Sequence, residues 1–231
     1  MKVSLLRKIL PESIRVPLVI WLRKNGISTA AQSFLYSREV RALKRAHSSE
    51  STFPQEELSK MKVLVVCAHF NHAQFLPDCV SSLINSSHTN WELMIVDDRS
   101  TAPDALNTIE AQTRLDTRVK AIQLTENSGA YVARNTGISA ACQDWTHLTF
   151  LDPDDVAQPN WLHHVLSVLR GREGSVRPFI QRFDVALKRP LHSYFGHCPT
   201  LHSRYAWERA GGFLPMRRSG DSEMTLRLSH L

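Results

Sequence analysis

The chain has 231 residues, of which 42% are hydrophobic and 22% are charged, enough to bury one sizeable core and leave a short appendage. Its four cysteines show neither the close pairs of a zinc site nor the density of a disulfide scaffold, so we expect reduced thiols. The formal net charge of +6 is unevenly placed: residues 1–50 hold ten Lys and Arg against three Glu, a balance of +7, and the rest of the chain balances at −1.

The N-terminal 50 residues are predicted to form a basic helical extension. Two helix-like segments, 4–24 and 29–47, place Leu, Ile, Val and Phe among Arg and Lys. This pattern fits a helix lying on anionic lipid, and it fits equally a helix packed on its own domain or on a partner. The longest apolar run, 16–22, is interrupted by Pro17 and is far shorter than the roughly 20 residues of a membrane span. With no secretory signal either, we expect a cytoplasmic chain, peripheral at the inner face of the cell membrane if the extension binds lipid.

The polar segment 51–61 is predicted to be a linker, so that a second domain spans 62–231. From residue 62 onwards, short apolar runs alternate with helix-like segments. The predicted strands are 62–67, 91–96, 119–124 and 147–151, and the predicted helices are 75–85, 103–113, 130–142 and 160–170. Strand and helix in turn predict an α/β fold with a mostly parallel, Rossmann-like sheet flanked by helices.

Two groups of carboxylates follow predicted strands. Asp97 and Asp98 come directly after the second strand, and Asp152, Asp154 and Asp155 come after the fourth. Ligands of an open parallel sheet bind outside the carboxyl ends of its strands, so we expect both groups at one edge. Their mutual repulsion favours a cation between them, and oxygen-only ligands favour Mg²⁺ or Mn²⁺ with positions left for substrate phosphates. The alternative is that these aspartates are turn formers and helix caps.

No phosphate-binding loop accompanies the acidic groups. The first strand is followed by Ala68, His69, Phe70 and Asn71 rather than by a glycine fingerprint, which excludes a dinucleotide site of the Rossmann type, and no Walker-type loop occurs. A nucleotidyltransferase, which would need a loop rich in Gly and Lys at the same place, is disfavoured for the same reason. A bound diphosphate would therefore depend on the metal and on cationic side chains.

Several ordered motifs over residues 62–228 resemble those of the family 2 glycosyltransferases, which have the A-type glycosyltransferase fold. They are VLVVCAHFN at 63–71, WELMIVDDRST at 91–101, ENSG at 126–129 with ARNTG at 133–137, FLDPDD at 150–155, and GGF at 211–213 with GDSE at 220–223 and Arg227. The first motif departs from the family, which usually has Pro and Thr where Ala68 and His69 stand. The resemblance implies an enzyme that moves a sugar from a nucleoside-diphosphate donor, by family analogy a UDP-sugar, to a hydroxyl group with inversion, using Mn²⁺ or Mg²⁺.

The resemblance also implies roles for individual residues on the donor side. Ala68 and Phe70 would line the base pocket, and Asp98 would bind the nucleobase. Asp152 would lie near the ribose, and Asp97 and Arg134 would also belong to the nucleotide-sugar site. Asp154 would bind the metal. For Arg134, contact with a phosphate and a plain surface position on its helix are both open.

The acceptor side is assigned by the resemblance to the segment 220–223. Asp221 is the candidate base that takes the acceptor proton, and we expect its location to be apart from the acidic groups of the donor side. The family more often has an acid immediately before this position, where Gly220 stands here, so Glu223 is kept as a support or substitute. The alternative is that Asp221 is a simple helix cap.

The implied partners are a nucleoside-diphosphate-sugar and a glycan or glycolipid acceptor of cell-surface polysaccharide or lipopolysaccharide synthesis. An anionic membrane surface is a further partner if the extension binds lipid, and no nucleic acid is expected. The chain stops at Leu231, inside the helix expected from Asp221, so we expect a catalytic domain that is short at its C-terminus. The alternative function is that of a truncated or inactive transferase that acts as a membrane- or partner-binding module.

Overall fold

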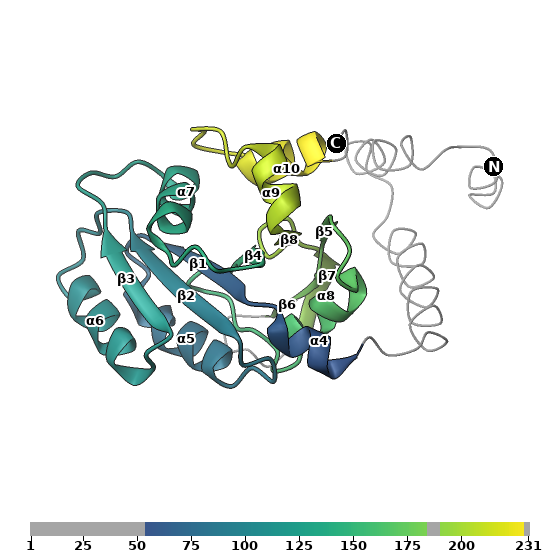
Figure 1. Cartoon of the computed structure of the whole chain (residues 1–231). Helices are drawn as coiled ribbons and strands as arrows, with labels where there is room; N and C mark the ends of the chain where they lie inside the picture. Colours follow the sequence, from purple (N-terminus) through teal and green to yellow (C-terminus); the bar gives the residue numbers. More distant parts are fainter. Residues whose placement is uncertain (1–53, 184–189, 229–231) are drawn as a thin grey trace. The chain divides into compact units, whose positions relative to one another are not determined.

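The computed structural model describes residues 54–183 and 190–228, which all belong to the unit Phe53–Leu231 (Figure 1). The predicted basic extension, 1–50, lies outside the described residues. Within the described part of the chain, no helix is both long enough and apolar enough to cross a membrane.

A six-stranded sheet forms the centre of the domain, with the strand order β3-β2-β1-β4-β8-β5. Its parallel part consists of β1 (Val63–His69), β2 (Trp91–Asp97), β3 (Val119–Gln123) and β4 (His147–Phe150). Its antiparallel edge consists of β8 (Leu201–Ser203), which pairs with β4, and β5 (Ser175–Val176), which pairs with β8. The predicted α/β fold with a mostly parallel sheet is confirmed.

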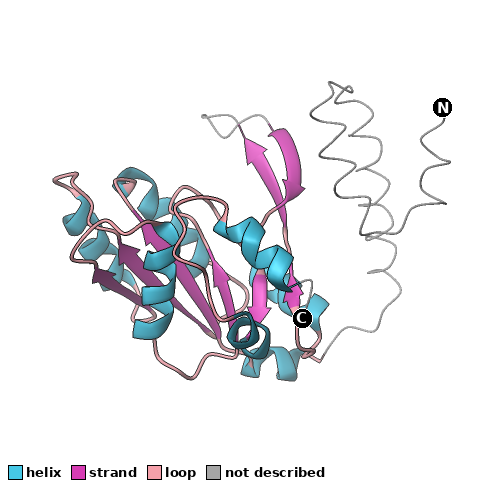
Figure 2. Ribbon diagram, turned by 90° about the horizontal axis from the view of Figure 1, so that it is seen from above, coloured by secondary structure: helices cyan, strands magenta, loops and turns pink. Residues whose placement is uncertain are grey.

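Helices cover both faces of this sheet (Figure 2). The hydrophobic core on one face includes residues of α4 (Gln55–Lys60), α5 (Leu76–Ile84), α6 (Ala105–Leu115) and α8 (Trp161–Leu169). The core on the other face includes residues of α7 (Ala130–Ala140), α9 (Arg204–Ala210) and α10 (Gly220–Leu228). A short 3₁₀ helix, η1 (Ala73–Phe75), precedes α5.

The sequence of β1 explains why both faces need cover. Successive side chains of a strand point to opposite faces. Val63, Val65 and Cys67 belong to the first core, and Leu64 and Val66 belong to the second. Because both sides are buried, the strand is apolar at nearly every position instead of alternating with polar residues.

Helix α7 lies directly on the sheet, and this contact positions the residues of its first turns. A Cβ atom at Gly137 would stand 2.6 Å from Val96 Cγ2 and 2.9 Å from Val66 Cγ1. Only glycine permits so close an approach of the helix backbone to β1 and β2. The first turns of α7, which carry Tyr131 and Arg134, are thereby held at the carboxyl edge of the sheet.

The prediction of a linker over 51–61 is wrong in part, because Gln55–Lys60 form the helix α4. Glu56 and Glu57 in its first turn and Lys60 in its last turn complement the helix dipole. Leu58 is only 1% exposed and belongs to the core, so a single apolar side chain attaches this polar helix to the domain.

A two-stranded antiparallel ribbon, β6 (Phe179–Phe183) with β7 (Pro190–Phe195), stands apart from the main sheet (Figure 2). We call it the β6–β7 ribbon. The sequence analysis did not predict it, because its polar and apolar residues alternate irregularly and the register shifts between Gln181 and Phe183. It follows the acidic segment 152–155 in the chain and returns to the sheet through β8.

Candidate active site

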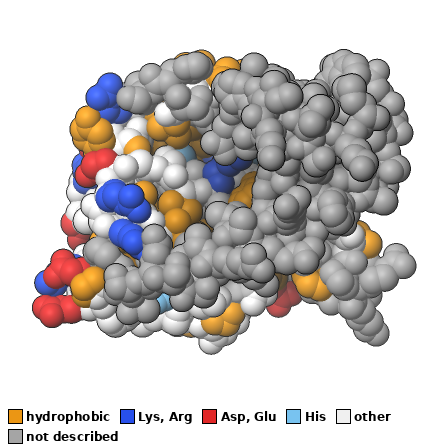
Figure 3. All heavy atoms as spheres, turned by 90° about the vertical axis from the view of Figure 1, so that its right-hand side faces the viewer, with side chains coloured by type: hydrophobic (Ala, Val, Ile, Leu, Met, Phe, Trp, Pro, Cys, Tyr) orange, Lys and Arg blue, Asp and Glu red, His pale blue; other side chains and the backbone are white. Residues whose placement is uncertain are grey.

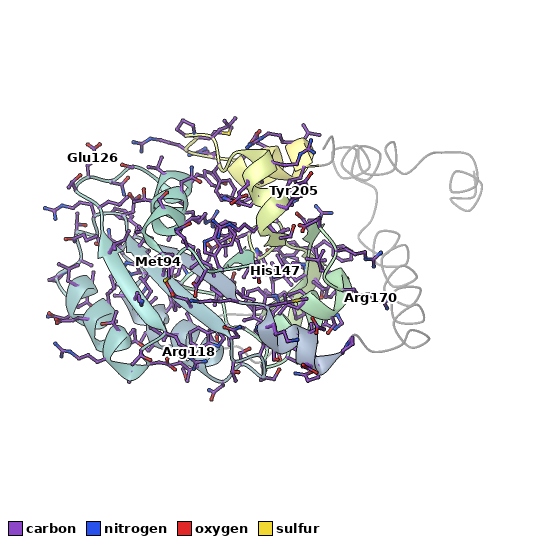
Figure 4. The ribbon with its side chains drawn as sticks, in the orientation of Figure 1. Met94, Arg118, Glu126, His147, Arg170 and Tyr205 are labelled. Atoms are coloured by element: carbon purple, nitrogen blue, oxygen red, sulfur yellow. The ribbon has the colours of Figure 1, made fainter. Side chains whose placement is uncertain are left out.

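The carboxyl ends of the parallel strands gather at one edge of the sheet. Figure 4 shows the direction: β3 begins beside Arg118 at one edge, and the loop that follows it carries Glu126 at the other. Asp97, at the end of β2, is buried there. It lies directly beside His69, the last residue of β1, in the parallel register.

Asp97 is held entirely by hydrogen bonds within the protein. Its carboxylate accepts from Gln123 Nε2 at 2.9 Å and from the backbone N–H of Ser100 at 3.2 Å, and it lies 3.0 Å from His69 Nδ1. Burial alone would raise the pKa of Asp97, but the hydrogen bonds from Ser100, His69 and Gln123 outweigh it and hold the pKa below its usual value. Asp97 therefore joins the ends of three strands, and its contact with a nucleotide stays a prediction.

Asp98 organises the start of α7. Its two carboxylate oxygens accept from the backbone N–H groups of Ser128 at 2.7 Å and Gly129 at 2.8 Å. The positive φ of +89° at Gly129 turns these amides toward the carboxylate. Asp98 thus fixes the loop that leads into α7 without being the N-cap residue of that helix, and its contact with a nucleobase stays a prediction.

The end of β1 carries the two residues that were predicted to line a base pocket. Ala68 is half-buried, and Phe70 is 42% exposed just beyond the strand. The following Asn71, with φ of +56°, accepts from the backbone N–H of Thr101 at 2.9 Å and of Ala102 at 3.0 Å. Asn71 therefore fixes the loop after β2 against the loop after β1, a role that sequence analysis missed.

Arg134 connects the donor-side and acceptor-side motifs. Its Nη2 donates to Asp152 Oδ1 at 2.7 Å, and its Nη1 donates to Asp221 Oδ1 at 3.0 Å. The side chain is buried, so its interpretation as a plain surface residue is wrong. The expectation that Asp221 lies apart from the donor-side acids is also wrong, because one guanidinium bonds to both carboxylates.

The surroundings of Arg134 keep it charged. Its guanidinium carbon lies 5.3 Å from the centre of the Phe150 ring, 5.4 Å from Tyr131 and 5.7 Å from Phe213. Burial alone would lower its pKa, but Cys198, Asp152 and Asp221 together raise it. Arg134 is therefore a permanent cation between aromatic faces, and its charge is already shared by the carboxylates of Asp152 and Asp221.

Asp221 lies in the first turn of α10 and receives a second donor from α7. The Tyr131 hydroxyl donates to Asp221 Oδ2 at 3.0 Å, so each carboxylate oxygen has a partner. A Cβ atom at Gly220 would stand 2.8 Å from the Tyr131 ring, which explains why glycine occupies the position where the family more often has an acid. Sequence analysis missed Tyr131, although it lies three residues before Arg134 and hence on the same helical face.

Glu223 forms a different pair. Both of its oxygens accept from Arg227, at 2.8 Å from Nε and 2.6 Å from Nη2. These hydrogen bonds hold the pKa of Glu223 below its usual value. Arg227 also donates to the backbone carbonyls of Ala210 and Gly212, so the pair fastens α10 to the end of α9. This geometry favours a bracing role, and the role of Glu223 as a substitute base stays a prediction.

The acidic segment 152–155 follows β4 at the same edge. Asp154 is exposed, whereas Asp155 is half-buried. Burial, and then repulsion from Asp152 and Asp154, raise the pKa of Asp155 to about 6, although Arg182 opposes the rise. The segment therefore carries more negative charge than its protein partners neutralise.

This excess of negative charge and the all-oxygen donor set fit a hard divalent cation. The described residues contain no group of three or more His, Cys, Asp or Glu that could hold such an ion by themselves. An ion bound through Asp154 would therefore complete its coordination with substrate oxygens and water, as Mg²⁺ and Mn²⁺ commonly do. The binding of metal by Asp154 stays a prediction.

A cavity of about 530 Å³ opens beside α10. Its lining includes Ser175, Arg177, Thr200, Tyr205, Arg209 and Thr225. The Thr225 hydroxyl donates to the backbone carbonyl of Asp221 at 2.8 Å, so the cavity reaches within one helical turn of that residue. Figure 3 views the structure from the side of β5 and α8, where basic and hydrophobic side chains lie next to one another.

Comparison with known proteins decides the family. The model of glycosyl transferase family 2 matches residues 64–222, which is more than half of the chain. The chain belongs to glycosyl transferase family 2. The match begins in β1 and ends in α10. Of the residues on which the resemblance was based, it leaves out only Val63, Glu223 and Arg227, and the resemblance is confirmed.

One relative of this family 2 member is the Bacillus subtilis (strain 168) protein TuaG, named as a glycosyltransferase of teichuronic acid biosynthesis. The two are 34% identical over 113 residues, which are 49% of this chain and 44% of TuaG. The chain spans less than half the length of TuaG and of two further curated relatives that it matches.

Two solved structures of similar fold carry ligands. Staphylococcus aureus TarS in complex with UDP superposes with a TM-score of 0.62 at 17% identity, over 73% of this chain and 55% of that one. The mannosyltransferase PcManGT from Pyrobaculum calidifontis, in complex with GDP-Man and Mn²⁺, superposes with a TM-score of 0.61 at 17% identity, over 72% of this chain and 51% of that one. These likenesses confirm the A-type glycosyltransferase fold.

Proposed function

We propose that this chain transfers a sugar from a nucleoside-diphosphate-sugar, with UDP as the expected nucleotide, to a hydroxyl group with inversion of the anomeric carbon. The observation that carries the proposal is the bridge of Arg134 between Asp152 and Asp221, because it brings a donor-side carboxylate and the candidate base to one guanidinium. The UDP bound to TarS and the GDP-Man bound to PcManGT support a nucleotide-sugar donor.

The proposal includes a divalent metal at Asp154. The Mn²⁺ of PcManGT supports such an ion, and the charge of the segment 152–155 fits it. What a bound Mn²⁺ or Mg²⁺ would supply is neutralisation of the charge that develops on the leaving diphosphate. The protein's own part is to hold Asp152 by Arg134, so that the ribose side of the donor meets an oriented carboxylate.

Asp221 is proposed to take the proton of the acceptor hydroxyl. Its two oxygens already accept from Tyr131 and Arg134, so the carboxylate is oriented before a substrate arrives. The cavity beside Thr225 is the proposed place of the acceptor, because Thr225 lies one turn of α10 after Asp221 and bonds to its backbone carbonyl. A glycan or glycolipid of cell-surface polysaccharide or lipopolysaccharide synthesis is the proposed acceptor, in line with the biosynthetic role for which TuaG is named.

Release of free sugar from UDP-sugars and GDP-sugars tests this function against the alternative of an inactive binding module. We expect slow hydrolysis of at least one donor in Mn²⁺ and a return to the uncatalysed rate in EDTA, because the leaving diphosphate then loses its counter-charge. Chromatography of the released nucleotide measures both rates. Rates no higher than the uncatalysed rate for every donor, in Mn²⁺ as in EDTA, would favour the binding module.

We also propose that the +7 segment 1–50 attaches the chain to the inner face of the cell membrane. Deleting residues 1–50 is expected to lower co-sedimentation with vesicles that contain anionic lipid, and added salt is expected to weaken the binding of the full chain. Equal sedimentation of the full and shortened chains at low salt would contradict the proposal.

A further inference from the structure

The β6–β7 ribbon carries one cationic side chain, Arg182, close to the acidic segment 152–155. Arg182 is the only Lys or Arg among the described residues of its two strands. The Arg182 Nε donates to the Tyr194 hydroxyl at 3.2 Å, and the guanidinium carbon lies 5.9 Å from the centre of the Tyr194 ring. Tyr194 on β7 therefore holds the Arg182 side chain of β6 across the ribbon.

The held guanidinium lies next to the acidic segment 152–155. Arg182 Nη1 is 4.0 Å from Asp155 Oδ1, which is the outer limit of an ion pair. The Arg182 side chain is 46% exposed, so this pair is weak and solvent competes for it. Moving the guanidinium from Asp155 to a stronger anion nearby would cost little.

The charges at the carboxyl edge of the sheet indicate that a bound donor needs a further cation. A donor diphosphate would bring about two negative charges close to the segment 152–155, and about one more would develop on it as the sugar leaves. A single divalent ion supplies only about two positive charges, so it does not balance this total. Arg134 is already bonded to Asp152 and Asp221. No glycine-rich loop follows β1 to offer backbone amides to a phosphate.

We propose that Arg182 binds the diphosphate of the nucleotide donor, and that Tyr194 positions it for this contact. The inference rests on the proposed function. The planar guanidinium suits phosphate oxygens, with which it forms charge-assisted, often paired hydrogen bonds. The β6–β7 ribbon then forms part of the donor site. The Arg182 guanidinium moves from Asp155 to the phosphate when the donor binds.

Calorimetry of the full chain tests the inference with nucleotides as probes. UDP, GDP, ADP, CDP and TDP are first compared on the wild type in Mn²⁺, and the tightest binder and its nucleoside are then titrated into the variants. Arg182→Gln is expected to weaken the diphosphate about 10- to 100-fold, which corresponds to the loss of a charge-assisted hydrogen bond, and to leave the nucleoside unchanged. Arg182→Lys keeps the positive charge but lacks the paired N–H donors of the guanidinium, so its diphosphate affinity is expected to lie between those of the wild type and Arg182→Gln.

Arg114→Gln on α6 is the matched control, because it removes the same charge from a side chain that is 73% exposed and pairs with Glu110. Equal losses for Arg182→Gln and Arg114→Gln would overturn the inference, and so would an equal loss for nucleoside and diphosphate. An unchanged or raised affinity in Arg182→Gln would make Arg182 only a partner of Asp155. A wild type that binds none of the five diphosphates would overturn the proposed function, and this inference with it.

Discussion

Replacing Asp221 by Asn is expected to lower sugar transfer by roughly 10²- to 10⁴-fold, the usual contribution of a positioned base. The Asn amide keeps the shape of the side chain but cannot take a proton from the acceptor hydroxyl. The loss is expected in kcat, because the substituted group acts on the transition state rather than on substrate binding. Initial rates of transfer at saturating donor and acceptor measure it.

The bridge through Arg134 adds a second expectation for Asp221→Asn. Because the guanidinium loses a charged partner and keeps Asp152, we expect the free energy of unfolding to fall by about 1–3 kcal/mol. Donor affinity is expected to change by less than about tenfold, since the contact of Arg134 with Asp152 remains. Urea unfolding and donor titration therefore accompany the kinetic measurement and separate a lost base from a lost fold.

Glu223→Gln is the paired control for Asp221→Asn. Its carboxylate is bonded on both oxygens by Arg227, so we expect a small loss of stability and near-normal transfer. A larger loss of transfer at Glu223 than at Asp221 would move the base to Glu223. Near-normal transfer in both variants would mean that neither carboxylate is the base.

The fold was predictable because its signals are local. The apolar runs of β1 and β2 are buried on both faces, and four predicted strands and four predicted helices occur in the expected order. The segment 51–61 misled us because a six-residue helix with one buried leucine has the composition of a linker. The β6–β7 ribbon was missed because a strand pair outside the main sheet has no regular pattern of burial.

The candidate site was predictable as a set of residues but not as a set of contacts. The order of the motifs identified Asp152, Arg134 and Asp221 as candidate site residues. Arg134 and Asp221 are 87 positions apart, however, and they meet because α10 packs beside α7. The glycine at position 220 likewise has a physical reason only once the ring of Tyr131 is seen against it. Such pairings are tertiary, and no local pattern encodes them.

Replacing Asp154 by Ala is expected to remove the metal-dependent part of donor binding and to lower turnover by at least about 10²-fold, comparable to the loss of one preorganised charge-stabilising group. Asp154 is exposed after β4, so the fold is expected to remain intact. Asp144→Ala is the matched control. That residue is an exposed aspartate at the opposite end of the same strand, where it pairs with Lys62 at 2.6 Å.

The most direct measurement is calorimetry of UDP and GDP binding to the wild type, Asp154→Ala and Asp144→Ala, each in Mn²⁺ and in EDTA. We expect Mn²⁺ to raise the affinity of the wild type and of Asp144→Ala by about tenfold or more and to leave that of Asp154→Ala nearly unchanged. That result would place a metal-dependent nucleotide site after β4. An equal gain from Mn²⁺ in all three proteins, or no gain in the wild type, would contradict it.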